Sequence, residues 1–436
     1  MWAYDSIFYQ IYPFGFCGAP EYNDGRLEPR LNKIRDWIPY LREMEVNALY
    51  LSPVFQSDRH GYDTRDYRTV DARLGTNDDL IALCEGCHRE GIRIILDGVF
   101  HHVGRGFWAF QEVQRHRWDS PYKDWFFLRF DQNSPYNDGF SYQGWEGHYD
   151  LVRLNLRNPA VKEYLFSSVR FWIETFGIDG LRLDVAYSLD HDFLIELRRF
   201  CEGIRPEFFL VGEIVNGLYA PLLEEDACHS CTNYEVYKGL YSSLNDLNLF
   251  EIDYSLNRLF GSQNGALYPG KHLFSFVDNH DVNRIASVLK DRQHLPLIYG
   301  MLFAIPGIPC LYYGSEWGAP GRKDNGSDRP LRPCFDAPVR NDLSEWVRKL
   351  AALRKAQKCL SYGDYRTLLI RNRQWVFERA IEGERITIAI NAEGAPADVV
   401  LPFDNENVEN LLTGENNTLS STVRLEPWQI VYWKRR

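Results

Sequence analysis

Acidic, basic and imidazole side chains follow several short apolar runs in this chain of 436 residues. Arg182 and Asp184 stand two positions apart, so in a strand both side chains would point to the same side. An arginine beside a carboxylate favours the ionised form, which suits a nucleophile. Glu213 closes the apolar run 208–211, and apolar surroundings raise a carboxyl pKa, which suits a general acid. Two carboxyls whose surroundings shift their pKa values in opposite directions are typical of enzymes that cleave glycosidic bonds.

Further polar groups end other apolar runs: Asp97 with His101 and His102, and His280 with Asp281. A single acid at a strand end is often only a cap for the next helix. The whole set favours a shared site, because the carboxyl ends of parallel barrel strands meet at one face. The two neighbouring histidines also suggest a metal pair, but no further ligands stand at helical or strand spacing, so we predict no metal site.

The elements that must position these groups alternate between apolar strands and amphipathic helices. This alternation predicts a parallel sheet, and near-continuous apolar strands predict burial on both faces. About eight such units over about 350 residues favour a (β/α)8 TIM barrel, and no G-x-G-x-x-G follows the first strand, which argues against a dinucleotide fold. The expected strands include 7–12, 48–51, 92–97, 179–184, 208–213, 273–277 and 308–313, and the expected helices include 31–45, 78–90, 160–176 and 192–203.

The sequence therefore predicts an α/β fold with two additions to the barrel. Residues 1–100 and 158–360 are assigned to the barrel. Residues 101–157, rich in Trp, Tyr, Asp and Gly, are assigned to a short insertion domain after strand 3, because a long excursion from a compact domain is usually functional. Residues 361–436 carry short strands split by Gly, Asn and Asp turns, which predicts a C-terminal antiparallel β-sandwich.

The composition limits the class of ligand and the cellular compartment that we expect for this protein. A net charge of −11 argues against a nucleic-acid partner, and 15% aromatic residues suit a cleft for an uncharged, ring-shaped ligand. No secretory signal and no apolar run of membrane length is visible, so we expect a cytoplasmic protein with no membrane partner. The nine cysteines are expected to be free thiols. Cys84 and Cys87 match a haem-attachment pattern, but they fall on the apolar face of an expected helix and are read as core residues.

Five segments carry a resemblance to a known family. They are Asp97-Gly-Val-Phe-His-His102, Gly180-Leu-Arg-Leu-Asp184, Val211-Gly-Glu213, Phe276-Val-Asp-Asn-His-Asp281 and Gly307-Ile-Pro-Cys-Leu-Tyr-Tyr-Gly314. In this order they resemble four motifs and the eighth-strand segment of the α-amylase family, glycoside hydrolase family 13. The stretch from Gly180 to Ala186 is similar to the cyclomaltodextrinase, neopullulanase and maltogenic amylase group, and Leu151-Val-Arg-Leu-Asn155 matches half of that group's insertion motif.

The resemblance implies a role for each matching residue. Asp184 would be the nucleophile, Glu213 the general acid and then base, and Asp281 the stabiliser of the transition state. In the substrate site, Arg182 would orient the nucleophile, Tyr62 would stack on the sugar, His102 and His280 would bind its hydroxyls, and Asp324 and Arg329 would bind the non-reducing end of the substrate. The tryptophans expected to shape the groove are Trp108, Trp118, Trp125 and Trp145.

The implied activity is retaining hydrolysis of α-1,4 bonds in maltodextrins and cyclodextrins, with α-1,6 bonds as a further target. The partner would be an α-glucan oligosaccharide, and no cofactor is expected. The family commonly has Asn where His101 stands, and that Asn helps to hold calcium, which prefers oxygen ligands, so we predict no tightly bound calcium there. A transglycosylase or isomerase of the same family, or a non-catalytic α-glucan-binding relative on the same fold, remain as alternatives.

Overall fold

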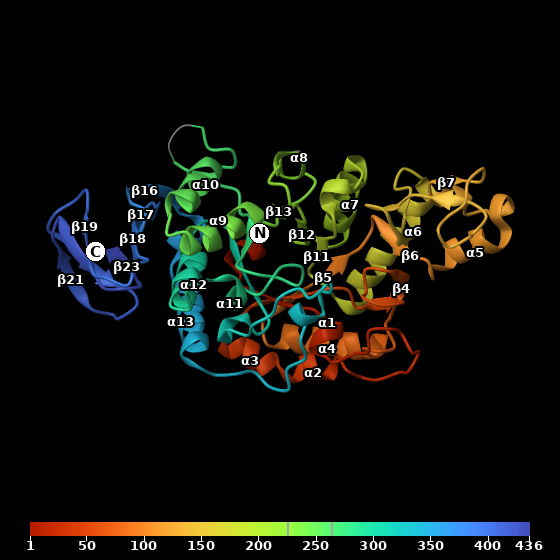
Figure 1. The fold of residues 1–436 in the computed structure, drawn as a ribbon, viewed down its shortest axis with the longest axis horizontal. Coiled ribbons are helices and arrows are strands. Elements are labelled where there is room, and N and C mark those ends of the chain that lie inside the picture. Colours follow the sequence, from red (N-terminus) through yellow and green to blue (C-terminus); the bar gives the residue numbers. More distant parts are fainter. Residues whose placement is uncertain (225, 263–264) are drawn as a thin grey trace.

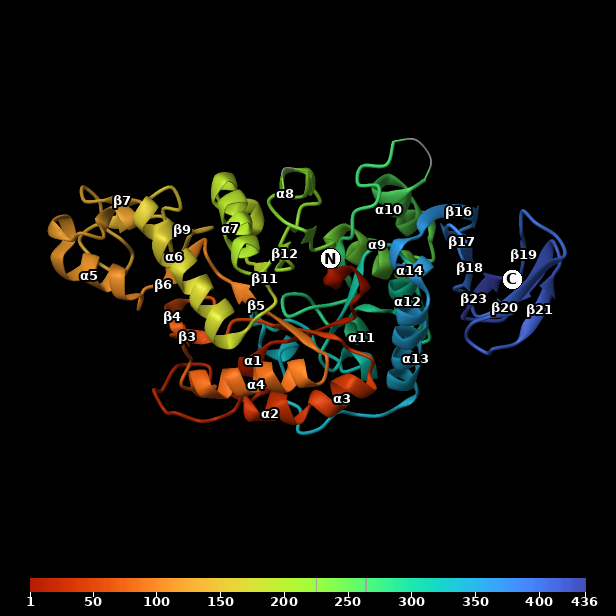
Figure 2. The same cartoon turned by 180° about the vertical axis from the view of Figure 1, so that it is seen from behind.

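The computed structural model describes residues 1–224, 226–262 and 265–436. Three parts follow one another along its longest axis (Figure 1). The strand barrel lies in the middle, the yellow and orange part around β7 and α5 lies at one end, and the blue C-terminal sheets lie at the other. The view from behind shows the same order, with the N-terminus at the barrel and the C-terminus in the terminal sheets (Figure 2).

Eight parallel strands form the barrel, which confirms the predicted fold class. They lie in the spatial order β13-β12-β11-β5-β2-β1-β15-β14, and a parallel bridge between Thr232 and Phe274 joins the two outer strands into a ring. In chain order the strands are β1 (Phe8–Ile11), β2 (Ala48–Leu51), β5 (Arg93–Gly98), β11 (Gly180–Leu183), β12 (Phe209–Gly212), β13 (Ser230–Cys231), β14 (Phe274–Phe276) and β15 (Ile308–Tyr312).

Successive residues of each barrel strand alternate between the interior and the outer helices. On β11, Leu181 and Leu183 pack in the outer apolar layer, so Arg182 between them faces the interior. Arg182 is in register with Asp97 of β5, which places the two side chains at the same level. Below them, toward the amino ends of the strands, the interior is filled by a second apolar cluster that includes Phe8, Ala48, Tyr50, Ile95, Phe209, Phe274 and Phe276.

Helices cover the outside of the barrel (Figure 1). Helix α4 shows how the sequence starts one of them: Thr76 accepts a hydrogen bond from the Asp79 amide, and the Asp79 carboxylate accepts one from the Thr76 amide. The longer helices are α4 (Asn77–Arg89), α6 (Pro159–Phe171), α7 (His191–Ile204), α9 (Tyr234–Asn245), α10 (Phe250–Phe260), α12 (His294–Ala304) and α13 (Asp342–Ala356). The shorter ones are α1 (Pro13–Phe16), α2 (Asn32–Asp36), α3 (Ile38–Glu43), α8 (Ala220–Leu223), α11 (Ile285–Val288) and α14 (Lys358–Tyr362).

The helix predicted over 31–45 is two helices. α2 ends at Asp36, and α3 begins at Ile38 with Pro39 in its first turn. Proline lacks the amide proton that a helix interior needs, so it starts a new helix here rather than continuing the old one. The prediction of one continuous helix was therefore wrong.

The sixth barrel strand, β13, was not predicted. It contains only Ser230 and Cys231, so no apolar run marks it in the sequence. Cys84 and Cys87 are buried in the outer core, as expected, and all nine cysteines lie in the described residues with no disulfide between them.

An insertion leaves the barrel directly after β5. Its three-stranded sheet begins at His102, so a histidine of the predicted site lies where the insertion starts. The insertion contains β6 (His102–Gly104), α5 (Trp108–His116), β7 (Leu128–Arg129), β8 (Ser141–Tyr142), β9 (Gly144–Trp145) and β10 (His148–Arg153). A separate hairpin of β3 (Phe55–Ser57) and β4 (Thr64–Val70) holds the loop that carries Tyr62.

Antiparallel sheets form the C-terminal part, in agreement with the predicted fold class. A six-stranded sheet, β16-β17-β18-β23-β20-β21, packs through Val376, Val399 and Leu425 against the pair β19-β22. The strands are β16 (Asp364–Ile370), β17 (Gln374–Ile381), β18 (Glu384–Asn391), β19 (Ala397–Val400), β20 (Glu406–Asn410), β21 (Asn416–Leu419), β22 (Thr422–Leu425) and β23 (Gln429–Arg435). Among the described residues, every helix is too short or too polar to cross a lipid bilayer.

Candidate active site

Arg182 connects three carboxylates at the carboxyl end of the barrel. Its Nη1 donates to Asp97 Oδ1 at 2.9 Å and to Asp184 Oδ1 at 2.7 Å. Its Nη2 lies 2.5 Å from Glu213 Oε1. All four side chains are buried, and they come from three neighbouring strands and the loops that follow them. The barrel therefore brings Asp184 and Glu213, 29 positions apart by number, to one guanidinium.

The residue after Asp184 orients Glu213. The backbone amide of Val185 donates to Glu213 Oε2 at 2.9 Å. Val185 has a φ of 41°, in the left-handed region that β-branched residues avoid. Holding such a conformation costs about 1–3 kcal/mol and persists only where the surrounding structure enforces it. The strain in this loop coincides with the hydrogen bond that fixes the glutamate.

Burial raises the pKa of both Asp184 and Glu213. The charge of Arg182 lowers both values, but it does not outweigh burial and the neighbouring acids: Glu213 raises the pKa of Asp184 further, and Asp281 raises that of Glu213. The sequence-based expectation for Asp184 considered the arginine alone and so missed the larger effect of burial. Because the carboxylates oppose one another's ionisation, the cluster holds a proton more tightly than free acids do, as a general acid requires.

A chain of hydrogen bonds links Tyr62 and His280. Gln10 Nε2 donates to His280 Nδ1 at 2.8 Å, so the imidazole proton sits on Nε2, and burial lowers the pKa of His280 to about 3, which keeps it neutral. That Nε2 lies 3.1 Å from Asp281 Oδ2 and also contacts the Tyr62 hydroxyl, which donates to Asp97 Oδ2 at 3.0 Å. The Tyr62 and His280 rings stack with centroids 5.7 Å apart.

Asp281 is also held by an arginine that the sequence reasoning missed. Arg332 Nη2 donates to Asp281 Oδ1 at 3.0 Å, and its Nε donates to the carbonyl of His280 at 3.0 Å. Arg332 lies in the long connection between β15 and α13, 51 positions beyond Asp281 by number. Nothing at that position of the sequence marks a strand end or a motif, so no local signal could have identified it.

His102 presents a buried polar atom to the same site. Its Nε2 lies 4.0 Å from Asp184 Oδ2 and has no hydrogen-bond partner among the described residues. Burial, followed by the neighbouring His101, lowers the pKa of His102 well below its usual value, so the ring is neutral. A buried polar atom without a partner is unfavourable unless a ligand or water satisfies it. The arrangement fits a hydroxyl group of a ligand placed beside Asp184.

The surroundings of His101 do not fit a calcium ion. Its Nδ1 lies 3.2 Å from His102 Nδ1, so the side chain presents nitrogen to nitrogen. Burial and then the positive charge of Arg153 lower the pKa of His101 to about 4. Calcium prefers several oxygen ligands of negative charge, and a neighbouring guanidinium repels it. Within the described residues no group of three or more His, Cys, Asp or Glu side chains is arranged to hold a metal ion.

The remaining predicted residues lie at different distances from this cluster. Asp324 and Arg329 are exposed on the connection that carries Arg332, and the hydrogen bonds of the cluster do not include them, so their role stays a prediction. Among the tryptophans of the insertion, Trp145 lies beside His102, with ring centroids 6.1 Å apart. Trp108 and Trp125 instead pack on each other, and Trp118 is 64% exposed.

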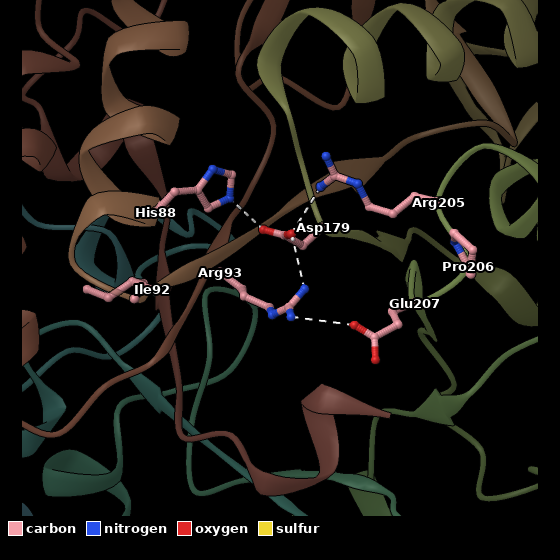
Figure 3. A pocket seen from close by; sticks show the side chains of 8 residues that line it. His88, Ile92, Arg93, Asp179, Arg205, Pro206 and Glu207 are labelled. Carbon is pink, nitrogen blue, oxygen red and sulfur yellow. Dashed lines mark hydrogen bonds and ion pairs between the residues drawn. The ribbon is translucent and has the colours of Figure 1, made fainter.

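The cavity shown in Figure 3 lies at the opposite end of the barrel. It has a volume of about 740 Å³ and is lined by residues that precede β5, β11 and β12 or begin them. Its charges are paired: Asp179 accepts from Arg205 at 3.0 Å and lies 2.7 Å from His88 Nε2, while Arg93 reaches Asp179 and Glu207 (Figure 3). Charged residues at the amino ends of barrel strands usually stabilise the fold, and these do so by cross-linking three connections.

Comparisons with known proteins agree with this geometry. The family described as "Alpha amylase, catalytic domain" matches residues 10–358. The chain is 31% identical to a cyclomaltodextrinase from Geobacillus thermopakistaniensis over 95% of this chain and 74% of that protein. Its fold is similar to the cyclic α-maltosyl-(1→6)-maltose hydrolase of Arthrobacter globiformis, with a TM-score of 0.86, 27% identity and full coverage of both chains. A cyclomaltodextrinase structure aligns with a TM-score of 0.88 and 28% identity over 100% of this chain and 78% of that chain.

Proposed function

We propose that this chain, which belongs to the α-amylase family of glycoside hydrolases, cleaves α-1,4 and also α-1,6 bonds of short α-glucans with retention at the anomeric carbon. The observation that carries the proposal is the meeting of Asp184 and Glu213 on the guanidinium of Arg182, with Asp281 joined to the same cluster through Tyr62 and His280. Two carboxyls held close together support a covalent double displacement rather than direct attack by water.

In the first step Asp184 acts as the nucleophile. Arg182 holds its Oδ1, which leaves Oδ2 to form a bond with the anomeric carbon. As that bond forms, the bond from the anomeric carbon to the glycosidic oxygen breaks, and Glu213 transfers its proton to that oxygen. The raised pKa of Glu213, caused by burial and by Asp281, supports this role as a proton donor.

In the second step water replaces the aspartate. The Glu213 carboxylate accepts a proton from water, the water oxygen bonds to the anomeric carbon, and the bond to Asp184 breaks. Asp281 stabilises the positive charge that develops on the sugar in both transition states, and the neutral rings of His102, His280 and Tyr62 bind the sugar hydroxyls and its face.

The substrate class rests on the relatives. The names of the two hydrolases describe cyclic α-glucans, one of them with an α-1,6 bond. We therefore infer that linear and cyclic maltooligosaccharides are its substrates. We also infer that the enzyme acts in the cytoplasm and needs no cofactor. The indole of Trp145 beside His102 supports a groove that takes a sugar ring against an aromatic face.

The test is the release of reducing sugar from maltotriose, maltose, panose and a cyclodextrin. We expect hydrolysis of at least one of these by the wild type and a loss of about 10⁴-fold or more in Asp184→Asn, because the variant lacks the nucleophile. No release by the wild type would contradict the proposal and favour a glucan-binding protein. Products longer than the substrate, at the expense of hydrolysis, would favour a transglycosylase instead.

A further inference from the structure

Among the described residues, Arg332 is the one side chain from outside the five segments of the family resemblance that forms a hydrogen bond with Asp281. We infer that Arg332 is a positioning residue for this reaction: its guanidinium fixes the orientation of the Asp281 carboxylate and keeps it charged, and Asp328 holds Arg332 in place. The inference rests on the proposed function, in which Asp281 must carry a negative charge beside the reacting sugar.

The contacts of Arg332 leave its guanidinium little freedom. One side reaches the catalytic strand end, through Asp281 Oδ1 at 3.0 Å and the His280 carbonyl at 3.0 Å. The other side reaches Asp328 Oδ2 at 3.1 Å. The guanidinium carbon lies 4.4 Å from the ring centre of Tyr12, so an aromatic face covers it from a third direction.

Arg332 is much better shielded than the acid it binds. Its side chain is 12% exposed, whereas that of Asp281 is 36% exposed and so has one side open to a ligand. The Oδ1 atom of Asp281 accepts from Arg332, and its Oδ2 atom lies 3.1 Å from His280 Nε2. A carboxylate held in one orientation needs little reorganisation when charge develops on the sugar, which is the condition for strong electrostatic stabilisation.

The charges around Asp281 decide its ionisation. Burial alone would raise the pKa of Asp281, but contacts with His280 and Arg332 hold that pKa below its usual value. Because His280 is neutral, Arg332 supplies the nearest permanent positive charge. The titratable and charged groups that face Asp281 are His280, Arg332, Arg182, Lys323, Glu213, Tyr62 and Tyr234.

A second pair continues the chain of charges toward the surface. Asp328 accepts from Arg332 and lies 2.9 Å from Lys323 Nζ. Asp328 therefore contacts two positively charged side chains. The positive charge of Arg332 is in turn shared between Asp328 and Asp281. The order Lys323, Asp328, Arg332, Asp281 alternates in sign, so each group stabilises the charge of the next.

Steady-state kinetics of Arg332→Met and Arg332→Lys test the inference. For Arg332→Met we expect kcat to fall about 100-fold with a smaller change in KM, since misplacing one reacting group has an effect of that size. Arg332→Lys keeps the positive charge but not the geometry of the guanidinium, so it should restore only part of kcat.

Arg340→Met is the matched control. Arg340 belongs to the same connection and forms an ion pair with Glu43, but both side chains are exposed, at 56% and 39%. This variant should leave kcat and KM unchanged. If Arg332→Met matches the wild type in both, the inference is overturned. Equal loss of kcat in Arg332→Met and Arg332→Lys would also overturn it, since that pattern means that the positive charge beside Asp281 has no effect on the reaction.

Calorimetric binding of acarbose separates this inference from the proposed function. In acarbose a basic nitrogen replaces the glycosidic oxygen of the cleaved bond, so its binding depends on the negative charge of the acidic cluster, Asp281 included, without requiring turnover. We expect at least about tenfold weaker binding to Arg332→Met and unchanged binding to Arg340→Met. Wild-type protein that hydrolyses no substrate would refute the proposed function alone, while equal affinity of wild type and Arg332→Met for acarbose would refute the role of Arg332.

Discussion

Glu316 is a buried acid whose titration should be visible in the stability of the whole protein. It follows β15 and is fully buried. Its Oε1 accepts hydrogen bonds from Tyr9 at 2.6 Å and from Tyr40 at 3.0 Å, whereas its Oε2 is buried without a hydrogen-bond partner among the described residues. Burial raises the pKa of Glu316 from 4.5 to about 7, although the two tyrosine hydroxyls lower it.

The sign of the effect follows from proton binding. The folded state binds the Glu316 proton more tightly than the unfolded chain, so this residue stabilises the fold at acid pH, and the contribution is lost as pH rises through about 7. Each pKa unit corresponds to about 1.4 kcal/mol, so a shift from 4.5 to about 7 is worth roughly 3 kcal/mol in total. Most of that amount, about 2–3 kcal/mol, should disappear between pH 5 and pH 8.

Urea unfolding of the wild type and Glu316→Gln at pH 5 and pH 8 measures this contribution. The glutamine has its own constant cost, since it buries amide protons without partners, but it does not titrate. The wild type should therefore lose about 2–3 kcal/mol more than the variant between the two pH values. Glu85→Gln, in which a side chain 66% exposed is changed, should follow the wild type. Equal losses in wild type and Glu316→Gln would refute the reasoning.

Three further predictions concern the site itself. Tyr62→Phe keeps the ring but removes the hydroxyl that joins His280 to Asp97. We expect kcat to fall about tenfold while the melting temperature changes little. An unchanged kcat would contradict a role for these hydrogen bonds in the reaction. Trp145→Ala should raise KM for maltotriose about tenfold, and Trp118→Ala, a matched change on the same insertion, should not. Equal KM values for the two variants would contradict a contact between the Trp145 ring and the sugar. Exhaustive chelation followed by added Ca²⁺ should leave both kcat/KM and the melting temperature unchanged. A calcium-dependent rise in either would contradict the conclusion that the surroundings of His101 do not fit a calcium ion.

Much of the barrel could be predicted from sequence because its strands are buried on both faces. Runs such as 48–51 and 208–211 are apolar throughout, and such runs are visible without knowing what covers them. The strand β13 could not be found in this way, since two residues carry no periodicity. The break between α2 and α3 had a visible cause, Pro39, which the prediction gave too little weight.

The site was predictable to the extent that its residues end strands. Asp97, Arg182 and Glu213 follow or lie in apolar runs, so the barrel geometry alone places them together. Arg332 reaches Asp281 from a long connection whose only helices are two short 3-10 turns among the described residues, and only the three-dimensional path of that connection brings the two together. The net pKa shift of Asp184 was equally out of reach, because burial depends on packing that no short segment encodes.

The most direct test of the account is to find which residue carries the sugar during turnover. A 5-fluoro-α-glucosyl fluoride forms the covalent intermediate quickly and releases it slowly, so the labelled protein can be digested and its peptides analysed by mass spectrometry. We expect the added glycosyl mass on Asp184, with none on that peptide in Asp184→Asn. A label on another side chain, or turnover with inversion at the anomeric carbon, would contradict the assignment of Asp184 as the nucleophile.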